Sequence, residues 1–155
     1  MALTRKEFLI EIAAGTFVLT GSTLLSSFLA SCSNPTEPQG NSLPTTTGTL
    51  SGNKLTVDVS AGSVLVKNGY AIVQYSGGAV LVSHADNGSY QALSSVCPHQ
   101  GCAVNQFNSG SKEFICPCHG SRFNTSGGVT NGPASSPLKQ FATIVNGTQL
   151  IITLS

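Results

Sequence analysis

Short runs of alternating or consecutive apolar residues fill most of the chain after residue 53. Alternation with a period of two is typical of a strand that buries one face. The sequence beyond residue 32 shows no convincing helical period. We therefore expect an all-β domain, with strands at residues 55–59, 63–67, 70–75, 79–83, 90–96, 140–145 and 148–154.

Three of the predicted connections contain Asn-Gly, at Asn68-Gly69, Asn87-Gly88 and Asn146-Gly147. Between two strand-like runs this dipeptide favours a hairpin, because a type I′ turn needs positive φ at both central residues. The pattern therefore predicts an antiparallel sheet that folds as a sandwich or a barrel.

The first 31 residues have the order of a bacterial export signal, with a charged start, an apolar stretch and small residues before Cys32. The start, Arg5-Lys6, resembles a twin-arginine signal, a route that carries folded proteins. Residues 29–32 resemble a lipobox, at which bacterial lipoproteins are cleaved and the new N-terminal cysteine is acylated. The alternative is an uncleaved membrane anchor over residues 12–30, but many Ser, Thr and Gly residues weaken it.

We therefore expect three parts: an export signal at residues 1–31, a flexible tether at 32–52 that begins with a lipid on Cys32, and a folded domain at 53–155. The tether is predicted because this segment is rich in Pro, Gly, Ser and Thr. Either form of the N-terminal segment places the domain on the outer, periplasmic side of a bacterial membrane.

Composition narrows the function. The 155 residues have a formal net charge of +1, and only 8% of them are charged. A nucleic-acid-binding protein needs a much denser positive charge, so this class is excluded. Five cysteines in so short a chain require an explanation.

Four of the five cysteines and two of the three histidines lie in two short motifs, Cys97-Pro98-His99-Gln100-Gly101-Cys102 and Cys116-Pro117-Cys118-His119-Gly120-Ser121. Thiolates and imidazoles at this spacing suit a soft or borderline metal. The third histidine, His84, lies outside both motifs and is interpreted as a surface residue at a strand end.

Three interpretations use these side chains differently. A structural zinc site of Cys97, His99, Cys116 and His119 gives no role to the other two cysteines. Loops joined only by disulfides leave both histidines unexplained. A [2Fe–2S] cluster with two cysteine and two histidine ligands, together with one disulfide, uses all six residues.

The double motif, Cys-x-His-x-Gly-Cys followed by Cys-x-Cys-His-x-Ser, resembles the signature of the Rieske iron–sulfur protein family, over about residues 54–155. The resemblance implies a Rieske-type antiparallel β-sandwich with a small cluster-binding subdomain at about residues 96–134. It also implies one [2Fe–2S] cluster per chain and the disulfide-bearing branch of the family. The implied site residues are Cys97 and Cys116 on one iron, His99 and His119 on the other, and a disulfide between Cys102 and Cys118.

Three further residues are implied to surround the cluster. Pro133, in Gly132-Pro133-Ala134, resembles the proline loop that covers the cluster. Ser121 matches a serine whose hydroxyl bonds a bridging sulfide in high-potential members, whereas Phe123 replaces a tyrosine that bonds a ligand sulfur there. Ligation by two cysteines and two histidines gives such clusters reduction potentials of about −150 to +300 mV. We expect a value below that of the members with both hydroxyl groups.

The sequence offers no nucleophile, general base or substrate pocket, so we expect no catalytic residues. The predicted function is one-electron transfer between a redox protein donor and acceptor, at a membrane. The alternatives are the Rieske subunit of a quinol-oxidising cytochrome bc complex and the small subunit of a molybdenum enzyme such as arsenite oxidase. Gln100 weakens the quinol alternative, because an apolar residue is usual at this position.

Overall fold

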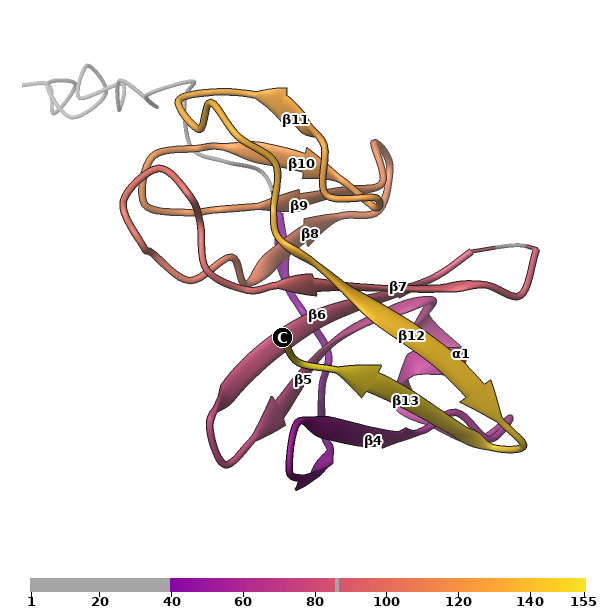
Figure 1. Ribbon diagram of the computed structural model, residues 1–155. Helices are drawn as coiled ribbons and strands as arrows, with labels where there is room; N and C mark the ends of the chain where they lie inside the picture. Colours follow the sequence, from indigo (N-terminus) through magenta and orange to yellow (C-terminus); the bar gives the residue numbers. More distant parts are fainter. Residues whose placement is uncertain (1–39, 86) are drawn as a thin grey trace, which may run out of the picture. The chain divides into compact units, whose positions relative to one another are not determined.

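The computed structural model describes residues 40–85 and 87–155, so the predicted export signal and Cys32 lie outside the described residues. The regular structure of the described part is β-strand except for one short helix, as the alternating pattern predicts (Figure 1). None of its helices is long and apolar enough to cross a bilayer. The elements are β1 (Asn41–Ser42), β2 (Thr45–Thr47), β3 (Thr49–Ser51), β4 (Lys54–Asp58), α1 (Val64–Asn68), β5 (Tyr70–Tyr75), β6 (Gly78–His84), β7 (Tyr90–Ser94), β8 (Gln106–Asn108), β9 (Glu113–Ile115), β10 (Arg122–Asn124), β11 (Val129–Asn131), β12 (Gln140–Asn146) and β13 (Gln149–Thr153).

Eight strands form the large sheet, in the order β2-β5-β6-β7-β12-β13-β4-β3. Neighbouring strands are antiparallel except β2 and β5, which are parallel. The sheet is nearly closed, because its two edge strands, β2 and β3, are separated along the chain by Gly48 alone. A Cβ atom on Gly48 would lie 2.6 Å from Cδ1 of Leu55 and 3.1 Å from the Thr56 carbonyl oxygen. Glycine at this point therefore lets the chain pass from β2 to β3 without displacing these neighbours.

The buried side chains of the large sheet are aliphatic apart from Tyr90. Their positions follow from the alternation of apolar and polar residues along the strands. In β4, for example, Leu55 and Val57 are buried, whereas Lys54 and Asp58 are exposed. Each aliphatic side chain buried in this way contributes about 1.5–3 kcal/mol to folding. We call this set the large-sheet core: Leu55, Val57, Leu65, Ala71, Val73, Val80, Val82, Tyr90, Ala92, Leu150 and Ile152.

The strand predicted at residues 63–67 and the hairpin predicted at Asn68-Gly69 are wrong, because this segment forms helix α1. The Ser63 hydroxyl accepts a hydrogen bond from the Val66 N–H (3.3 Å) and caps the start of the helix. Gly69 ends the helix with φ at 77° and donates its N–H to the Leu65 carbonyl oxygen. Asn-Gly is typical of both hairpins and helix ends, since both need positive φ. At Asn87-Gly88 and Asn146-Gly147, hairpins β6–β7 and β12–β13 form as predicted.

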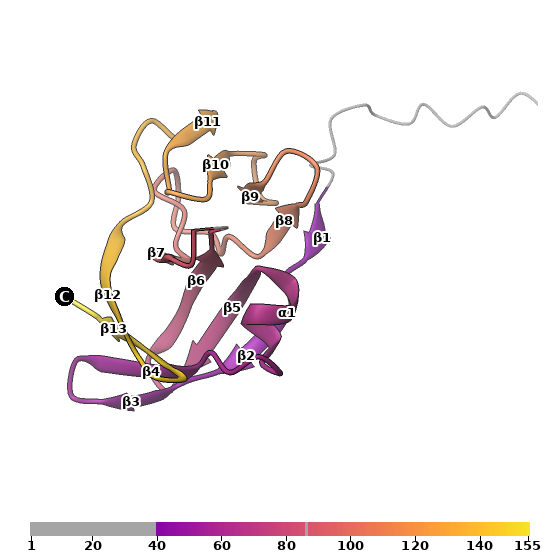
Figure 2. The ribbon, with the colours of Figure 1, turned by 90° about the vertical axis from the view of Figure 1, so that its right-hand side faces the viewer.

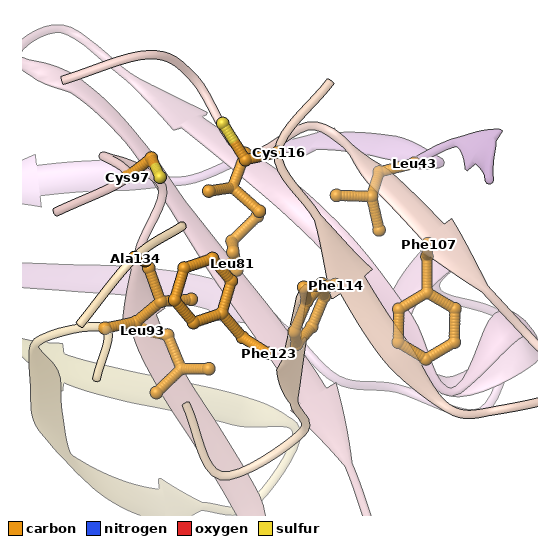
Figure 3. Close-up of a cluster of buried hydrophobic side chains, with 11 residues drawn as sticks. Leu43, Leu81, Leu93, Cys97, Phe107, Phe114, Cys116, Phe123 and Ala134 are labelled. Atoms are coloured by element: carbon orange, nitrogen blue, oxygen red, sulfur yellow. The ribbon is translucent and has the colours of Figure 1, made fainter. Parts of the chain in front are cut away.

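Five short strands form the small sheet, in the order β1-β8-β9-β10-β11, all antiparallel (Figure 2). Strands β8 to β11 fall within residues 96–134, where the cluster-binding subdomain is expected. These strands pack on the small-sheet core (Figure 3). Three phenylalanines of this core come from the small sheet, and two of its leucines, Leu81 and Leu93, come from the large sheet. This core consists of Leu43, Leu81, Leu93, Cys97, Val104, Phe107, Phe114, Cys116, Phe123, Ala134 and Leu138.

The flexible tether predicted at residues 32–52 differs from the structure in its second half, where β1, β2 and β3 form. These strands pair by backbone hydrogen bonds with β8, β5 and β4, so they need few apolar side chains. Leu43, which is only 6% exposed, anchors the segment in the small-sheet core. The folded region therefore includes residues 41–52, and residues 32–39 lie outside the described part.

Candidate metal centre

The two Cys-His motifs form two loops with the same backbone hydrogen bonds. In each loop the cysteine carbonyl accepts a bond of 2.9 Å from the N–H of a glycine four residues later, Gly101 on Cys97 and Gly120 on Cys116. Both glycines have φ at 74°, a conformation that glycine adopts without strain. Each cysteine N–H also bonds the carbonyl five residues later, at 2.8 Å for Cys97 and 2.9 Å for Cys116. The shared spacing of the motifs therefore gives two equivalent loops, which we call loop 1 (residues 97–102) and loop 2 (residues 116–121).

Cys97 and Cys116 carry free thiols, and each residue is only 1% exposed. Burial raises the pKa of the Cys116 thiol, and a hydrogen bond with the Cys97 side chain raises this pKa further. The backbone N–H groups of Cys118 and His119 bond the Cys116 sulfur and act in the opposite direction, favouring the thiolate. The two sulfurs therefore face one another in a buried space where backbone donors can stabilise negative charge.

The imidazoles of His99 and His119 meet edge to face, with ring centroids 4.8 Å apart and an interplanar angle of 89°. His99 is half-buried, and its Nδ1 is buried without a hydrogen-bond partner among the described residues. An unsatisfied buried polar atom costs about 1–3 kcal/mol. A metal bound at this nitrogen would remove that cost. His119 is exposed, so loop 2 presents its imidazole at the surface.

Cys102 and Cys118 form a disulfide that joins the two loops, with Cα atoms 6.5 Å apart. The Cys116 sulfur lies within 4.8 Å of both disulfide sulfurs. A disulfide sulfur carries no thiolate charge, so these two cysteines are not available as thiolate ligands. The residues that could hold a metal in these loops are therefore Cys97, Cys116, His99 and His119, and this donor set fits a [2Fe–2S] cluster.

A third loop, residues 132–134, contacts loop 2. The Ala134 N–H donates to the Ser121 hydroxyl oxygen (3.0 Å), and both residues are buried. Asn131, next to this loop, donates from Nδ2 to the Gly120 carbonyl oxygen (3.4 Å). Sequence reasoning selected Pro133 here but missed Ala134, because a backbone donor leaves no signal in the side-chain pattern. Pro133 itself is exposed.

Phe123 is fully buried in the small-sheet core, next to loop 2 along the chain (Figure 3). His84 lies at the end of β6 and stacks on Tyr90, with ring centroids 4.4 Å apart. It lines a cavity of about 420 Å³ that none of the loop residues lines. The interpretation of His84 as a strand-end residue outside the metal centre therefore agrees with its position.

The surface around the loops carries little formal charge. Between residues 87 and 138 the sequence has three charged side chains, Lys112, Glu113 and Arg122. Arg122 directly follows loop 2, and its guanidinium pairs with the Glu113 carboxylate (3.5 Å). Val96, immediately before loop 1, is 54% exposed, and Gln100 within that loop is also exposed. The stretch that contains both loops therefore has few charged side chains, with a net charge of +1, and it exposes an apolar side chain at Val96.

Comparison with known proteins agrees with this site. The Rieske [2Fe-2S] domain family matches residues 56–142. A cytochrome b6-f complex iron-sulfur subunit of Chlorobaculum thiosulfatiphilum is 37% identical over 82 residues, which cover 53% of this chain and 44% of that protein. The corresponding subunit of Gloeobacter violaceus is 42% identical over 60 residues, covering 39% of this chain and 32% of that protein. The chain thus spans less than half the length of these curated relatives.

A solved structure of similar fold is the cyanobacterial plasma membrane Rieske protein PetC3 from Synechocystis PCC 6803. It is 33% identical with a TM-score of 0.54, and the match covers 63% of this chain and 98% of that chain. The family match extends over more than half of the sequence and includes both loops and the disulfide. The chain therefore belongs to the Rieske [2Fe–2S] family, and it is an electron-transfer protein with one [2Fe–2S] cluster.

Proposed function

We propose that this protein is a membrane-tethered one-electron carrier on the outer side of a bacterial membrane. Its cluster is held by Cys97 and Cys116 on one iron and by His99 and His119 on the other. The observation that carries the assignment is that two equivalent loops bring two buried free thiols together and two imidazoles together, one imidazole with an unpartnered buried nitrogen.

The chemistry of the donor set supports one-electron transfer. When bound, a [2Fe–2S] cluster accepts and releases one electron. The two thiolates supply two negative charges and the neutral imidazoles supply none, so this set opposes an added electron less than four thiolates would. The backbone N–H groups of Cys118 and His119 at the Cys116 sulfur further stabilise the reduced, more negative state.

The exposed side of loop 2 supports transfer to a protein partner. His119 is exposed, whereas both thiols are buried, so a partner approaches the cluster most closely at this imidazole. Because the stretch that contains the loops has only three charged side chains, we expect little of the electrostatic steering that raises association rates at low salt. The transfer rate to a charged redox protein, such as a basic cytochrome c, is therefore expected to depend only weakly on ionic strength.

A second candidate is the Rieske subunit of a quinol-oxidising complex, because the relatives above are named as cytochrome b6-f complex iron-sulfur subunits. Gln100 argues against it, since an exposed amide at the tip fits an apolar quinol pocket poorly. Purification of the protein with its native membrane separates the two candidates. Co-purification of a b-type cytochrome supports the subunit, and isolation of the chain alone supports the free carrier.

Single substitutions test the ligand assignment. Cys97→Ala, Cys116→Ala, His99→Ala and His119→Ala are each expected to lose the visible colour and the bound iron. His84→Ala is the matched control and should keep both, because His84 lies outside the loops. Full iron content in any of the four variants would contradict the assignment.

The membrane attachment rests on the sequence of residues 1–32. A Cys32→Ala variant should carry no acyl chain and should keep residues 1–31, because cleavage at a lipobox takes place at the cysteine. Mass spectrometry of the N-terminal peptide should find the added acyl chains on Cys32 in the wild-type protein. An unmodified Cys32 on an uncleaved chain would instead support the signal-anchor alternative.

A further inference from the structure

A buried hydrogen bond joins the third loop to loop 2. The Ala134 N–H lies 3.0 Å from the Ser121 hydroxyl oxygen, across 13 residues of sequence. Ser121 is 0% exposed and Ala134 is 5% exposed, so water cannot easily replace either partner. Ser121 is also fixed through its carbonyl oxygen, which accepts the Cys116 N–H at 2.9 Å. Two separate backbone contacts therefore hold Ser121 at the end of the loop that begins with Cys116.

This contact fixes the direction in which the Ser121 hydroxyl can donate. A serine hydroxyl has one donor hydrogen and two acceptor lone pairs. Because the oxygen accepts from Ala134, the hydroxyl hydrogen must point away from the Ala134 N–H. Among the described residues the Ser121 hydroxyl donates to no acceptor, and a buried donor without an acceptor is costly. Its acceptor is therefore expected in the space beside Cys116 that a metal group would fill.

We propose that Ala134 is a positioning residue for electron transfer, because its backbone N–H aims the Ser121 hydroxyl at the sulfur atoms of the bound cluster. The inference rests on the proposed function, since it requires the cluster to be held by these loops. A donor to sulfur favours the reduced, more negative state. The third loop thus sets part of the reduction potential through Ser121.

A double-mutant cycle in the midpoint potential tests the proposal on the cluster-loaded protein. Ser121→Ala is expected to lower the potential by the equivalent of about fivefold in the reduction equilibrium, the usual contribution of one neutral hydrogen bond. Ala134→Pro removes the backbone N–H without changing charge, and should lower the potential in the same direction but by less. In the double variant Ala134→Pro should add nothing to the shift from Ser121→Ala. Ala134→Gly keeps the N–H and is the matched control, with a potential close to that of the wild type.

Additive shifts in the double variant would overturn the proposal, because Ala134 would then act independently of Ser121. An unchanged potential in Ser121→Ala would also overturn it. A wild-type protein that binds no iron would instead contradict the proposed function, and iron analysis before voltammetry separates these failures.

Hydrogen exchange gives a second measurement should Ala134→Pro fail to fold. The backbone amide of Ala134 should exchange at least tenfold faster in Ser121→Ala than in the wild type, because its acceptor is lost. The measured peptide should cover residues 132–138 in the cluster-loaded protein. Equal exchange in the two proteins would overturn the proposal.

Discussion

The two sheets of this protein are built in different ways. Apart from its edge strands β2 and β3, the large sheet has strands of five to seven residues, and its core is almost entirely aliphatic. The small sheet has strands of two or three residues around three phenylalanines, and its loops carry all four candidate ligands. The large sheet is thus stabilised by the apolar side chains that its strands bury. The small sheet supports loop 1 and loop 2, which carry the candidate ligands.

The difference has an energetic consequence. Fixing the backbone of one residue costs about 1–2 kcal/mol, and a three-residue strand has at most two buried side chains, such as Phe123 in β10, to offset this cost. Loops 1 and 2 have instead a disulfide, paired backbone hydrogen bonds and buried thiols that converge. We conclude that the small sheet depends on a disulfide and hydrogen-bonded loops in addition to hydrophobic burial, whereas the large sheet depends on hydrophobic burial and strand pairing.

Removal of the disulfide should have the largest effect, and it should be confined to the small sheet. Cys102→Ala with Cys118→Ala is expected to lower the free energy of unfolding by about 3 kcal/mol, the value for a closed loop of this size. Hydrogen exchange should accelerate in residues 96–134 and stay slow in β4 to β6. Gly62→Ala is the control, because an added Cβ there would meet nothing within 4 Å. Equal acceleration in both sheets would contradict the division of stability described above.

Gly48→Ala should lower the stability of the large sheet instead of the small sheet. The added methyl group clashes with Leu55 and the Thr56 carbonyl where the large sheet closes, so we expect a loss of about 1–3 kcal/mol in stability. The reduction potential should not change, because the site lies on the small sheet. Gly62→Ala is the control, since a Cβ there would meet nothing within 4 Å. Chemical denaturation and voltammetry measure both effects, and a shifted potential in Gly48→Ala would show that the sheets are not independent.

Phe123→Tyr is expected to change the site with a smaller effect on the fold. A new hydroxyl that bonds a ligand sulfur should raise the midpoint potential by about 40 mV, the equivalent of about 1 kcal/mol for one electron. Phe107→Tyr is the control, because Phe107 belongs to the same core but stacks on Tyr70 and lines the cavity apart from the loops. Protein-film voltammetry should find an upward shift in the first variant only. No shift in Phe123→Tyr would mean that its ring does not face a ligand sulfur.

The smallest effect is expected at Glu113, on the small sheet. Hydrogen bonds from Thr130 and Ser111 lower the pKa of this carboxyl, with a further contribution from Arg122. A lowered pKa in the folded state stabilises the fold above the unfolded pKa, and this stability is lost as the pH falls through the folded pKa. Glu113→Gln should therefore weaken the decline of stability below about pH 4.5, by less than about 1 kcal/mol because the ion pair is partly exposed. Thermal unfolding between pH 3 and 7 measures this, and identical pH profiles would contradict it.

The sequence was sufficient to predict the structure where one local sequence pattern determines the backbone conformation. Leu55 and Val57 alternate with polar neighbours, and β4 follows from that alternation alone. The two Cys-His motifs likewise lie on two loops of one shape, because their shared glycine spacing determines the turn.

The predictions from sequence were wrong at two kinds of position. In one, the same sequence pattern suits two structures, and in the other, a strand pairs with residues far along the chain. Asn68-Gly69 suits a helix end as well as a hairpin, and the cap from Ser63 favours the helix. The Thr-rich residues 45–51 look like a linker, yet they form strands because β5 and β4 offer partners far along the chain. The contact between Ala134 and Ser121 depends on the third loop meeting loop 2, and no local pattern encodes that meeting.

The most direct measurement is low-temperature electron paramagnetic resonance of the dithionite-reduced protein, with its histidines labelled by nitrogen-15. The account predicts a signal from one unpaired electron on a binuclear iron cluster, coupled to two histidine nitrogens. His84→Ala should leave that coupling unchanged, whereas His99→Ala and His119→Ala should abolish the signal with the iron. A colourless protein that contains zinc and gives no paramagnetic resonance signal would contradict the account. A signal without coupling to histidine nitrogens would contradict it as well.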